Sequence, residues 1–195
     1  MTSQRPSSGL HAAIITCVIT LALTLWPAAP SAQPSPPTDA QVKAAFLYNF
    51  GKFVTWPPAA ERTDQPFVIG ILGDDPFGDT LDQMIVDRAI RGRKVAVRRF
   101  TAVNEATTHC QLLFISASES SRLPEILSAS SRSNVLTVSD LERFAERGGM
   151  IGFHVEDKRV RFDINAAAAA ASGLAMSSQL LKLARSVVGP QGPRE

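Results

Sequence analysis

Apolar residues recur at steps of three and four positions along residues 39–54, which is the spacing of one face of a helix. The face holds Val42, Phe46, Asn49, Phe50 and Phe53. Thr38 or Asp39 is a suitable N-cap. Trp56-Pro57-Pro58 ends the helix, because a proline disfavours helical geometry in the residue before it. The folded part of the chain therefore begins with one amphipathic helix.

Short apolar runs then alternate with helical patterns. The apolar and β-branched runs predict strands at 66–72, 94–100, 111–116, 135–138, 150–155 and 159–164. Helical spacing predicts helices at 80–88 and 118–130, a short helix after Asp140 with Leu141 and Phe144 inward, and a helix from Asn165 to about Val188. The two last strands join at Glu156-Asp157-Lys158 as a hairpin. This order predicts an α/β sandwich whose mixed, mostly parallel sheet is flanked by helices, with a C-terminal hairpin and a long final helix.

The first 32 residues have the order of a secretory signal peptide. A weakly basic start precedes the apolar run of residues 12–26, and small residues follow it up to Ala32, after which we expect cleavage. An uncleaved anchor is the alternative, but the run is shorter than the roughly 20 residues that a spanning helix needs. We expect a short tether at 33–38, a single α/β domain at 39–189 and a flexible tail at 190–195. The mature protein is then exported, without direct insertion into the membrane.

The composition is that of one ordinary globular domain. The chain has 195 residues, of which 45% are hydrophobic, and its formal net charge is +2. This charge is too small to indicate nucleic acid as a partner.

No pattern along the chain indicates catalysis. The glycines at 70, 73 and 78 follow a predicted strand, but their spacing matches neither a dinucleotide fingerprint nor a P-loop. The histidines and aspartates lack the spacing of a metal site. We therefore expect no catalytic, cofactor-binding or metal-ligating residues and no enzyme activity. Cys17 leaves with the signal peptide, so Cys110 is an unpaired thiol, for which burial is the commonest fate.

Two stretches are candidate surfaces for partners. The aromatic residues of and after the first helix form the candidate partner interface: Phe46, Tyr48, Phe50 and Trp56. The small residues 166–171 permit close packing, either on the protein's own sheet or on a second copy. Aromatic residues are enriched at interfaces but also fill cores, so core packing is the default for both stretches.

Several motifs along the chain resemble the YfiR-like family. They are Val42-Lys43-Ala44-Ala45-Phe46-Leu47-Tyr48-Asn49-Phe50, Gly73-Asp74-Asp75-Pro76-Phe77-Gly78, Cys110-Gln111-Leu112-Leu113-Phe114-Ile115, Val135-Leu136-Thr137-Val138-Ser139-Asp140 and Val160-Arg161-Phe162-Asp163-Ile164-Asn165. The resemblance implies a periplasmic, non-enzymatic α/β protein. It also implies binding to the periplasmic sensor domain of an inner-membrane diguanylate cyclase, repression of that cyclase and lower cyclic-di-GMP and biofilm formation, as well as homodimers and disulfides.

One departure from the family concerns cysteine. Relatives carry a cysteine where Gly70 stands here, which can pair with the one at the position of Cys110, so the resemblance implies that Cys110 has lost its partner. The alternative function that the sequence leaves open is a periplasmic module that binds a small ligand and reports to another membrane protein.

Overall fold

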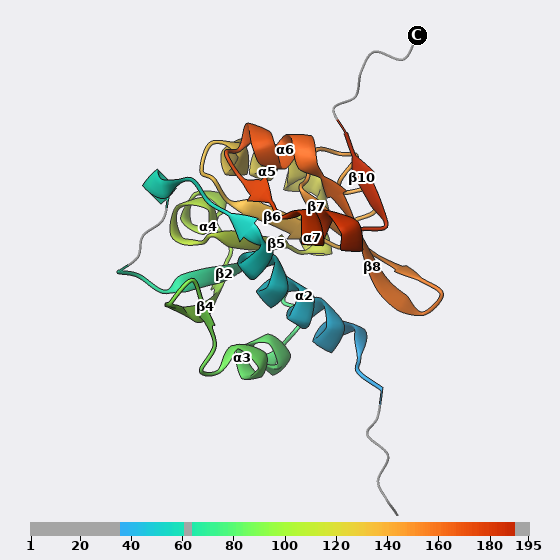
Figure 1. The fold of residues 1–195 in the computed structure, drawn as a ribbon, viewed down its shortest axis with the longest axis horizontal. Coiled ribbons are helices and arrows are strands. Elements are labelled where there is room, and N and C mark those ends of the chain that lie inside the picture. The colour runs from blue at the N-terminus through green and yellow to red at the C-terminus, as the bar shows by residue number, and fades with distance from the viewer. Residues whose placement is uncertain (1–35, 61–63, 190–195) are drawn as a thin grey trace, which may run out of the picture. The chain divides into compact units, whose positions relative to one another are not determined.

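Eight strands form the main sheet in the part of the chain that the computed structural model describes, residues 36–60 and 64–189 (Figure 1). Their order across the sheet is β10-β8-β7-β6-β5-β2-β4-β3. The strands are β2 (Phe67–Leu72), β3 (Ala89–Ile90), β4 (Arg93–Phe100), β5 (Leu112–Ile115), β6 (Leu136–Ser139), β7 (Ile151–Glu156), β8 (Arg159–Asn165) and β10 (Ser186–Val188). The β7–β8 and β3–β4 pairs are antiparallel and the other pairs are parallel. The predicted mixed, mostly parallel sheet and its hairpin are confirmed.

The chain divides into two units, residues 1–36 and 37–195, and the fold is that of the second. The predicted signal peptide and flexible tail lie outside the described residues. Helices flank the sheet: α2 (Asp39–Phe53), α3 (Asp79–Ile85), α4 (Val103–His109), α5 (Leu123–Ser131), α6 (Ala166–Ala171) and α7 (Ser178–Leu183). The 3-10 turns η2 (Pro58–Ala60) and η3 (Ala117–Arg122) and a second, two-stranded sheet of β1 (Val54–Thr55) and β9 (Ala175–Met176) complete it.

The first helix begins where the sequence predicts. The Thr38 hydroxyl accepts a hydrogen bond from the Gln41 N–H at 3.3 Å, and the Gln41 side chain accepts one from the Thr38 N–H at 2.9 Å. This reciprocal pair is a capping box, which satisfies two backbone donors that a helix start leaves free. Ala44, Leu47 and Phe50 of α2 are then buried against the sheet.

Two apolar cores lie on the two faces of the sheet. The first core packs α2, α3, α6 and α7 against one face and includes Phe50, Ile69 and Phe162. The second packs α4 and α5 against the other face and includes Cys110 and Phe144. Figure 1 shows α2 and α7 in front of the sheet and α4 and α5 behind it. Every residue of β2 is buried, because this central strand is covered on both faces.

The long final helix is a wrong prediction. Asn165 caps a helix as predicted, with its side chain accepting from the Ala168 N–H, but α6 ends at Ala171. Gly173 follows in the left-handed region (φ +73°), which ends a helix. Ser177 then caps the separate helix α7, and the chain returns to the sheet as β10. The β-branched residues Val187 and Val188 of β10 fit a strand better than a helix.

The predicted helix after Asp140 is also absent, and residues 141–148 form a series of turns there. Arg143 has a φ of +55°, which a right-handed helix excludes. Phe144 is buried as predicted, whereas Leu141 is half-buried. The helix α4 was missed by the sequence analysis.

Candidate functional site

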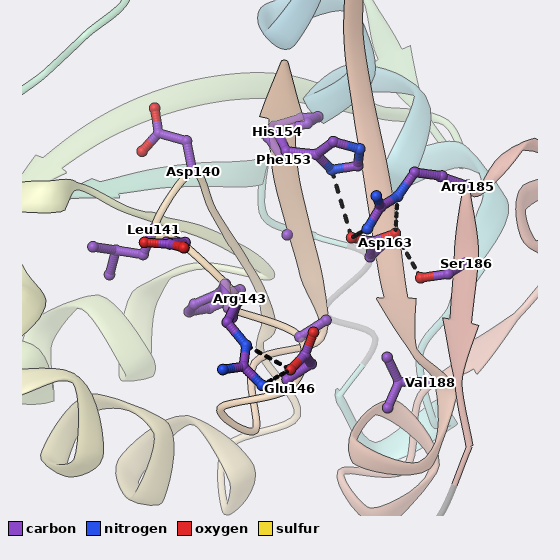
Figure 2. A pocket seen from close by; sticks show the side chains of 14 residues that line it. Asp140, Leu141, Arg143, Glu146, Phe153, His154, Asp163, Arg185, Ser186 and Val188 are labelled. Carbon is purple, nitrogen blue, oxygen red and sulfur yellow. Dashed lines mark hydrogen bonds and ion pairs between the residues drawn. The ribbon is translucent and has the colours of Figure 1, made fainter. Parts of the chain in front are cut away.

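A cavity of about 350 Å³ opens on the sheet face that carries α4 and α5, beyond the area that those helices cover. Its walls come from the turn of residues 140–148, hereafter the 140s turn, and from β7, β8 and β10 (Figure 2). Alternation along β8 sends Phe162 into the first core and Asp163 to the cavity face. At this end of the sheet, the cavity wall is thus a turn rather than a helix.

Two glycines let the 140s turn lie close to β7. A Cβ on Gly152 would stand 3.3 Å from both the Ala145 nitrogen and the Phe144 Cβ. A Cβ on Gly149 would overlap the Phe144 ring. The ring is 1% exposed in the second core, so the turn is anchored beside the cavity by an aromatic side chain that has no space to sink further.

Asp163 organises the wall formed by β8 and β10. Its carboxylate accepts hydrogen bonds from Arg185 Nε at 3.0 Å, from Arg185 Nη2 at 2.8 Å and from the Ser186 hydroxyl at 2.6 Å. His154 of β7 places its Nδ1 3.5 Å from the same carboxylate. Figure 2 shows these three side chains converging on Asp163. One carboxylate thus ties the edge strand β10 to β7 and β8.

The surroundings of Asp163 lower its pKa. Burial alone would raise the pKa, but the hydrogen bonds from Arg185 and Ser186 and the charges of Arg185 and His154 outweigh it. The same pairing raises the pKa of Arg185. Both groups are therefore charged at neutral pH.

A second ion pair forms the opposite wall. Arg143 Nε lies 2.7 Å from Glu146 Oε2, and the guanidinium makes a further contact with the same oxygen. Arg143 is held in the left-handed region, which is costly for a residue with a side chain and is often found near functional sites. The two walls thus present one arginine–carboxylate pair each, on either side of the cavity (Figure 2).

His154 leaves one polar atom without a protein partner. Its Nε2 is buried, and no hydrogen bond to it occurs within the described residues. Among those residues, no three histidine, cysteine, aspartate or glutamate side chains gather as a metal ion would require. No helix in residues 36–60 and 64–189 has the length and apolar character needed to cross a bilayer.

The four predicted interface residues lie in different surroundings. Phe50 is fully buried, and Trp56 is 4% exposed with its Nε1 donating to the Asn134 carbonyl at 3.0 Å. Both belong to the core, which was the default for these residues, and neither offers a free side chain to a partner. Phe46 is half-buried and packs against Phe50 with ring centroids 5.8 Å apart.

Tyr48 is also half-buried, away from the other three aromatic residues. Its hydroxyl donates to the Ala89 carbonyl at 3.2 Å, and Lys52 and Arg88 lie over its ring. The hydroxyl therefore occupies a carbonyl of the edge strand β3, which limits the pairing of that edge with other chains.

The outer side of α2 carries a shallow apolar hollow of about 420 Å³, which we call the α2 hollow. It is lined by Pro37, Gln41, Val42, Ala45, Phe46, Asn49 and Met84. Of the predicted interface residues, Phe46 alone contributes to it. The other lining residues were not predicted as part of an interface. The helical spacing of Val42, Phe46 and Asn49 was the signal, because it placed these three on one face of the helix.

The cavity residues were missed as a site. Asp163 was recognised only as part of a motif, and Arg185 was placed in the long final helix. The β-branched Val187-Val188 after Arg185 is the signal that indicates a strand there. No sequence signal indicated that Arg143 adopts a left-handed conformation.

Cys110 is a buried thiol without a disulfide in the described part of the chain. It is 5% exposed, its Sγ donates to the Ala106 carbonyl at 2.8 Å, and burial raises its pKa. A Cβ placed on Gly70 would lie 3.0 Å from Cys110 Sγ. That is about the separation between the Cβ of one half-cystine and the Sγ of the other. Position 70 therefore faces Cys110, as the resemblance implied.

We expect Gly70→Cys to form a disulfide with Cys110. After mild oxidation, the denatured variant should show no free thiol, whereas the mature wild type should react slowly when native and at once when denatured. The added cross-link should stabilise the fold by roughly 2–4 kcal/mol relative to the size-matched control Gly70→Ser, because it constrains the unfolded chain. Thiol labelling with mass spectrometry measures the first effect and thermal unfolding the second. Two reactive thiols in the oxidised variant would contradict the predicted geometry.

We expect Asp163→Asn to lower the free energy of unfolding by roughly 1–2 kcal/mol at pH 7, because it removes charged hydrogen bonds at a partly exposed site. Since the folded-state pKa lies below the ordinary value of 3.8, this contribution is full above that value and is lost as the pH falls through the folded pKa. The difference between wild type and variant should therefore be constant near neutrality and shrink in acid. Urea unfolding between pH 7 and pH 3 measures it. Glu142→Gln, an exposed change in the 140s turn, is the control, and an acid-independent difference would refute the assignment.

The comparisons with known proteins agree with this fold. Two solved structures share it: a conserved domain protein from Vibrio cholerae O1 biovar El Tor strain N16961 (TM-score 0.54, 13% identity, 79% of this chain covered) and an ABC domain in complex with L-Trp from Streptococcus pneumoniae (0.53, 13%, 76%). The matched part spans 62% of each of those chains, and at this identity the likeness concerns the fold alone. No curated protein matches the chain. The family profile described as YfiR/HmsC-like matches residues 40–185, and the chain belongs to that family.

Proposed function

We propose that this protein represses an inner-membrane diguanylate cyclase by binding the cyclase's periplasmic sensor domain. The YfiR-like family is periplasmic and regulatory rather than catalytic, and this general role applies to the chain. The finer part of the proposal, that the partner is a diguanylate cyclase and that binding represses it, rests on the resemblance to the family. A protein outside the cytoplasm acts on cyclic-di-GMP only by binding one conformation of a membrane partner more tightly than the other.

The α2 hollow is the observation that supports a docking role. It is an apolar depression on the exposed side of a helix that is fixed on its inner side by buried side chains. A rigid helix that presents apolar residues in a depression suits an apolar anchor from a partner protein. A difference of about 1.4 kcal/mol in affinity for the two cyclase conformations shifts their ratio about tenfold.

Deletion of the gene should raise cyclic-di-GMP and surface attachment, and the increase should vanish when the partner cyclase is also removed. Ala45→Glu should reproduce the deletion, because it places a charge in the α2 hollow where a partner would have to desolvate it. Ser128→Glu adds the same charge to an exposed position of α5 on the other face of the sheet and should retain repression. Both variants need wild-type secretion and thermal stability. Unchanged cyclic-di-GMP on deletion, with the partner expressed, would refute the repressor assignment.

The cavity supports a second candidate, a module that binds a small ligand and reports it to a membrane protein. Its volume lies in the range of small-molecule sites. Each of its two walls holds an arginine–carboxylate pair, and Asp140 and Glu142 add two further carboxylates to the lining, so a net anion is disfavoured while both signs of charge are present. A small zwitterion, with one group for each sign of charge, fits this arrangement best.

L-tryptophan is a suitable probe, because it is a zwitterion and is the ligand named for one of the solved proteins of similar fold. Isothermal titration of the mature protein compares L-tryptophan with two analogues that keep the indole ring. Tryptamine lacks the carboxylate, and indole-3-propionate lacks the ammonium group. We expect L-tryptophan to bind more tightly than either analogue, and Arg185→Met to weaken it, because the carboxylate loses its guanidinium. Binding of either analogue as tight as that of L-tryptophan would contradict the preference for a zwitterion. If none of the three compounds binds, repression without a small ligand is the better account.

A further inference from the structure

The 140s turn is attached to the opposite side of the sheet by an ion pair. Asp140 follows β6, and its carboxylate accepts a hydrogen bond from Lys43 Nζ at 2.9 Å. Lys43 belongs to α2, whose buried residues lie in the first core, whereas the cavity opens on the second face. The side chains are 15% and 26% exposed, so solvent screens the pair only in part. One end of the cavity wall is therefore fixed to the helix that bears the α2 hollow.

The turn has a second attachment, to α6. Asn165, the last residue of β8, donates from Nδ2 to the Ala145 carbonyl at 2.9 Å. The Oδ1 of the same side chain accepts from the Ala168 N–H at 2.9 Å and caps α6. A single amide thus contacts the turn with one atom and a helix on the first face with the other.

The turn has no freedom to move toward the sheet. The Phe144 ring already fills the space above Gly149, and the turn lies so near Gly152 that a Cβ there would stand 3.3 Å from the Ala145 nitrogen. Any movement of the turn that a bound molecule causes is therefore outward or sideways. Both directions change the Asp140 and Ala145 contacts, because these join the turn to elements that lie outside the cavity.

We propose that the 140s turn transmits the occupancy of the cavity to α2 and α6 through the Lys43–Asp140 and Asn165–Ala145 contacts. The inference rests on the second candidate function for the importance of the cavity, and it gives that site a mechanism of regulation. Occupancy loosens the Lys43–Asp140 pair and alters the exposure of the α2 hollow. The free energy of binding at the cavity is thereby linked to binding at α2, and the linkage is reciprocal.

Hydrogen–deuterium exchange on the mature protein tests the two contacts without a ligand or a partner. Asp140→Asn should speed exchange roughly two- to fivefold in both the turn and the first half of α2, in keeping with the loss of a partly exposed ion pair. Asn165→Asp keeps the oxygen that caps α6 but removes the donor to Ala145, and it should speed exchange in the turn and at the start of α6. Arg143→Met breaks a pair that lies wholly within the turn, and it should affect the turn alone.

A cavity-filling variant tests the direction of transmission. Val188 lines the cavity from β10 and is half-exposed, so Val188→Trp adds bulk there while remaining at the surface. We expect it to speed exchange in the first half of α2, and we expect that effect to be absent when Asp140→Asn is already present. Persistence of the effect in the double variant would show that it travels through β8 rather than the turn.

Three results would overturn the proposal: an Asp140→Asn effect confined to the turn or to α2, an Arg143→Met effect that reaches α2, or a Val188→Trp effect that is independent of Asp140. If Val188→Trp does not fold, the Asp140→Asn and Arg143→Met measurements still decide the outcome. None of these measurements involves a cyclase, so failure of the repressor assignment leaves them unaffected. The reverse also holds, because repression through the α2 hollow does not require the cavity to communicate with it.

Discussion

Four phenylalanine rings hold the beginning and the end of the domain together. Phe46 and Phe50 of α2 pack against Phe153 and Phe162 of the β7–β8 hairpin, with ring centroids 5.1–5.9 Å apart. Aromatic pairs at such distances add stabilisation beyond the burial of their area. The contact fixes α2 over one face of the hairpin, so the hairpin's other face is the one that remains for the cavity. The positions of the α2 hollow and the cavity on opposite faces follow from this cluster.

Elements with a strong local signal were predictable. The first helix has helical apolar spacing and a suitable N-cap, and the structure confirms the helix and the cap at Thr38. The side chains that it buries are Ala44, Leu47 and Phe50, so of the predicted face only Phe50 is fully enclosed. The sheet strands are short apolar runs bounded by turn residues, and the mixed, mostly parallel arrangement follows from their alternation with helices. The final segment was not predictable in the same way, because residues 166–171 strongly favour a helix while Gly173 and Ser177 break it into two. Local propensity alone does not show where such a helix stops.

The cavity depended on information that no short window of sequence contains. Asp163 of β8 and Arg185, the residue before β10, become neighbours only through the parallel pairing of these two strands. Arg143 contributes through a left-handed backbone conformation, in the same turn in which Phe144 packs over Gly149. The aromatic residues of and after α2 were visible in the sequence, yet whether each was buried depended on the tertiary packing, which left Phe46 half-buried and enclosed Phe50 and Trp56.

Gly70, which faces Cys110 where relatives carry a second cysteine, has a consequence for how the domain folds after export. In the described part of the chain, the packing between β2 and α4 is made by apolar side chains around a lone thiol, with no covalent link between these elements. This part of the fold forms without oxidation of thiols and without disulfide exchange, so it does not require disulfide-forming enzymes. A reducing environment therefore leaves the contact unchanged.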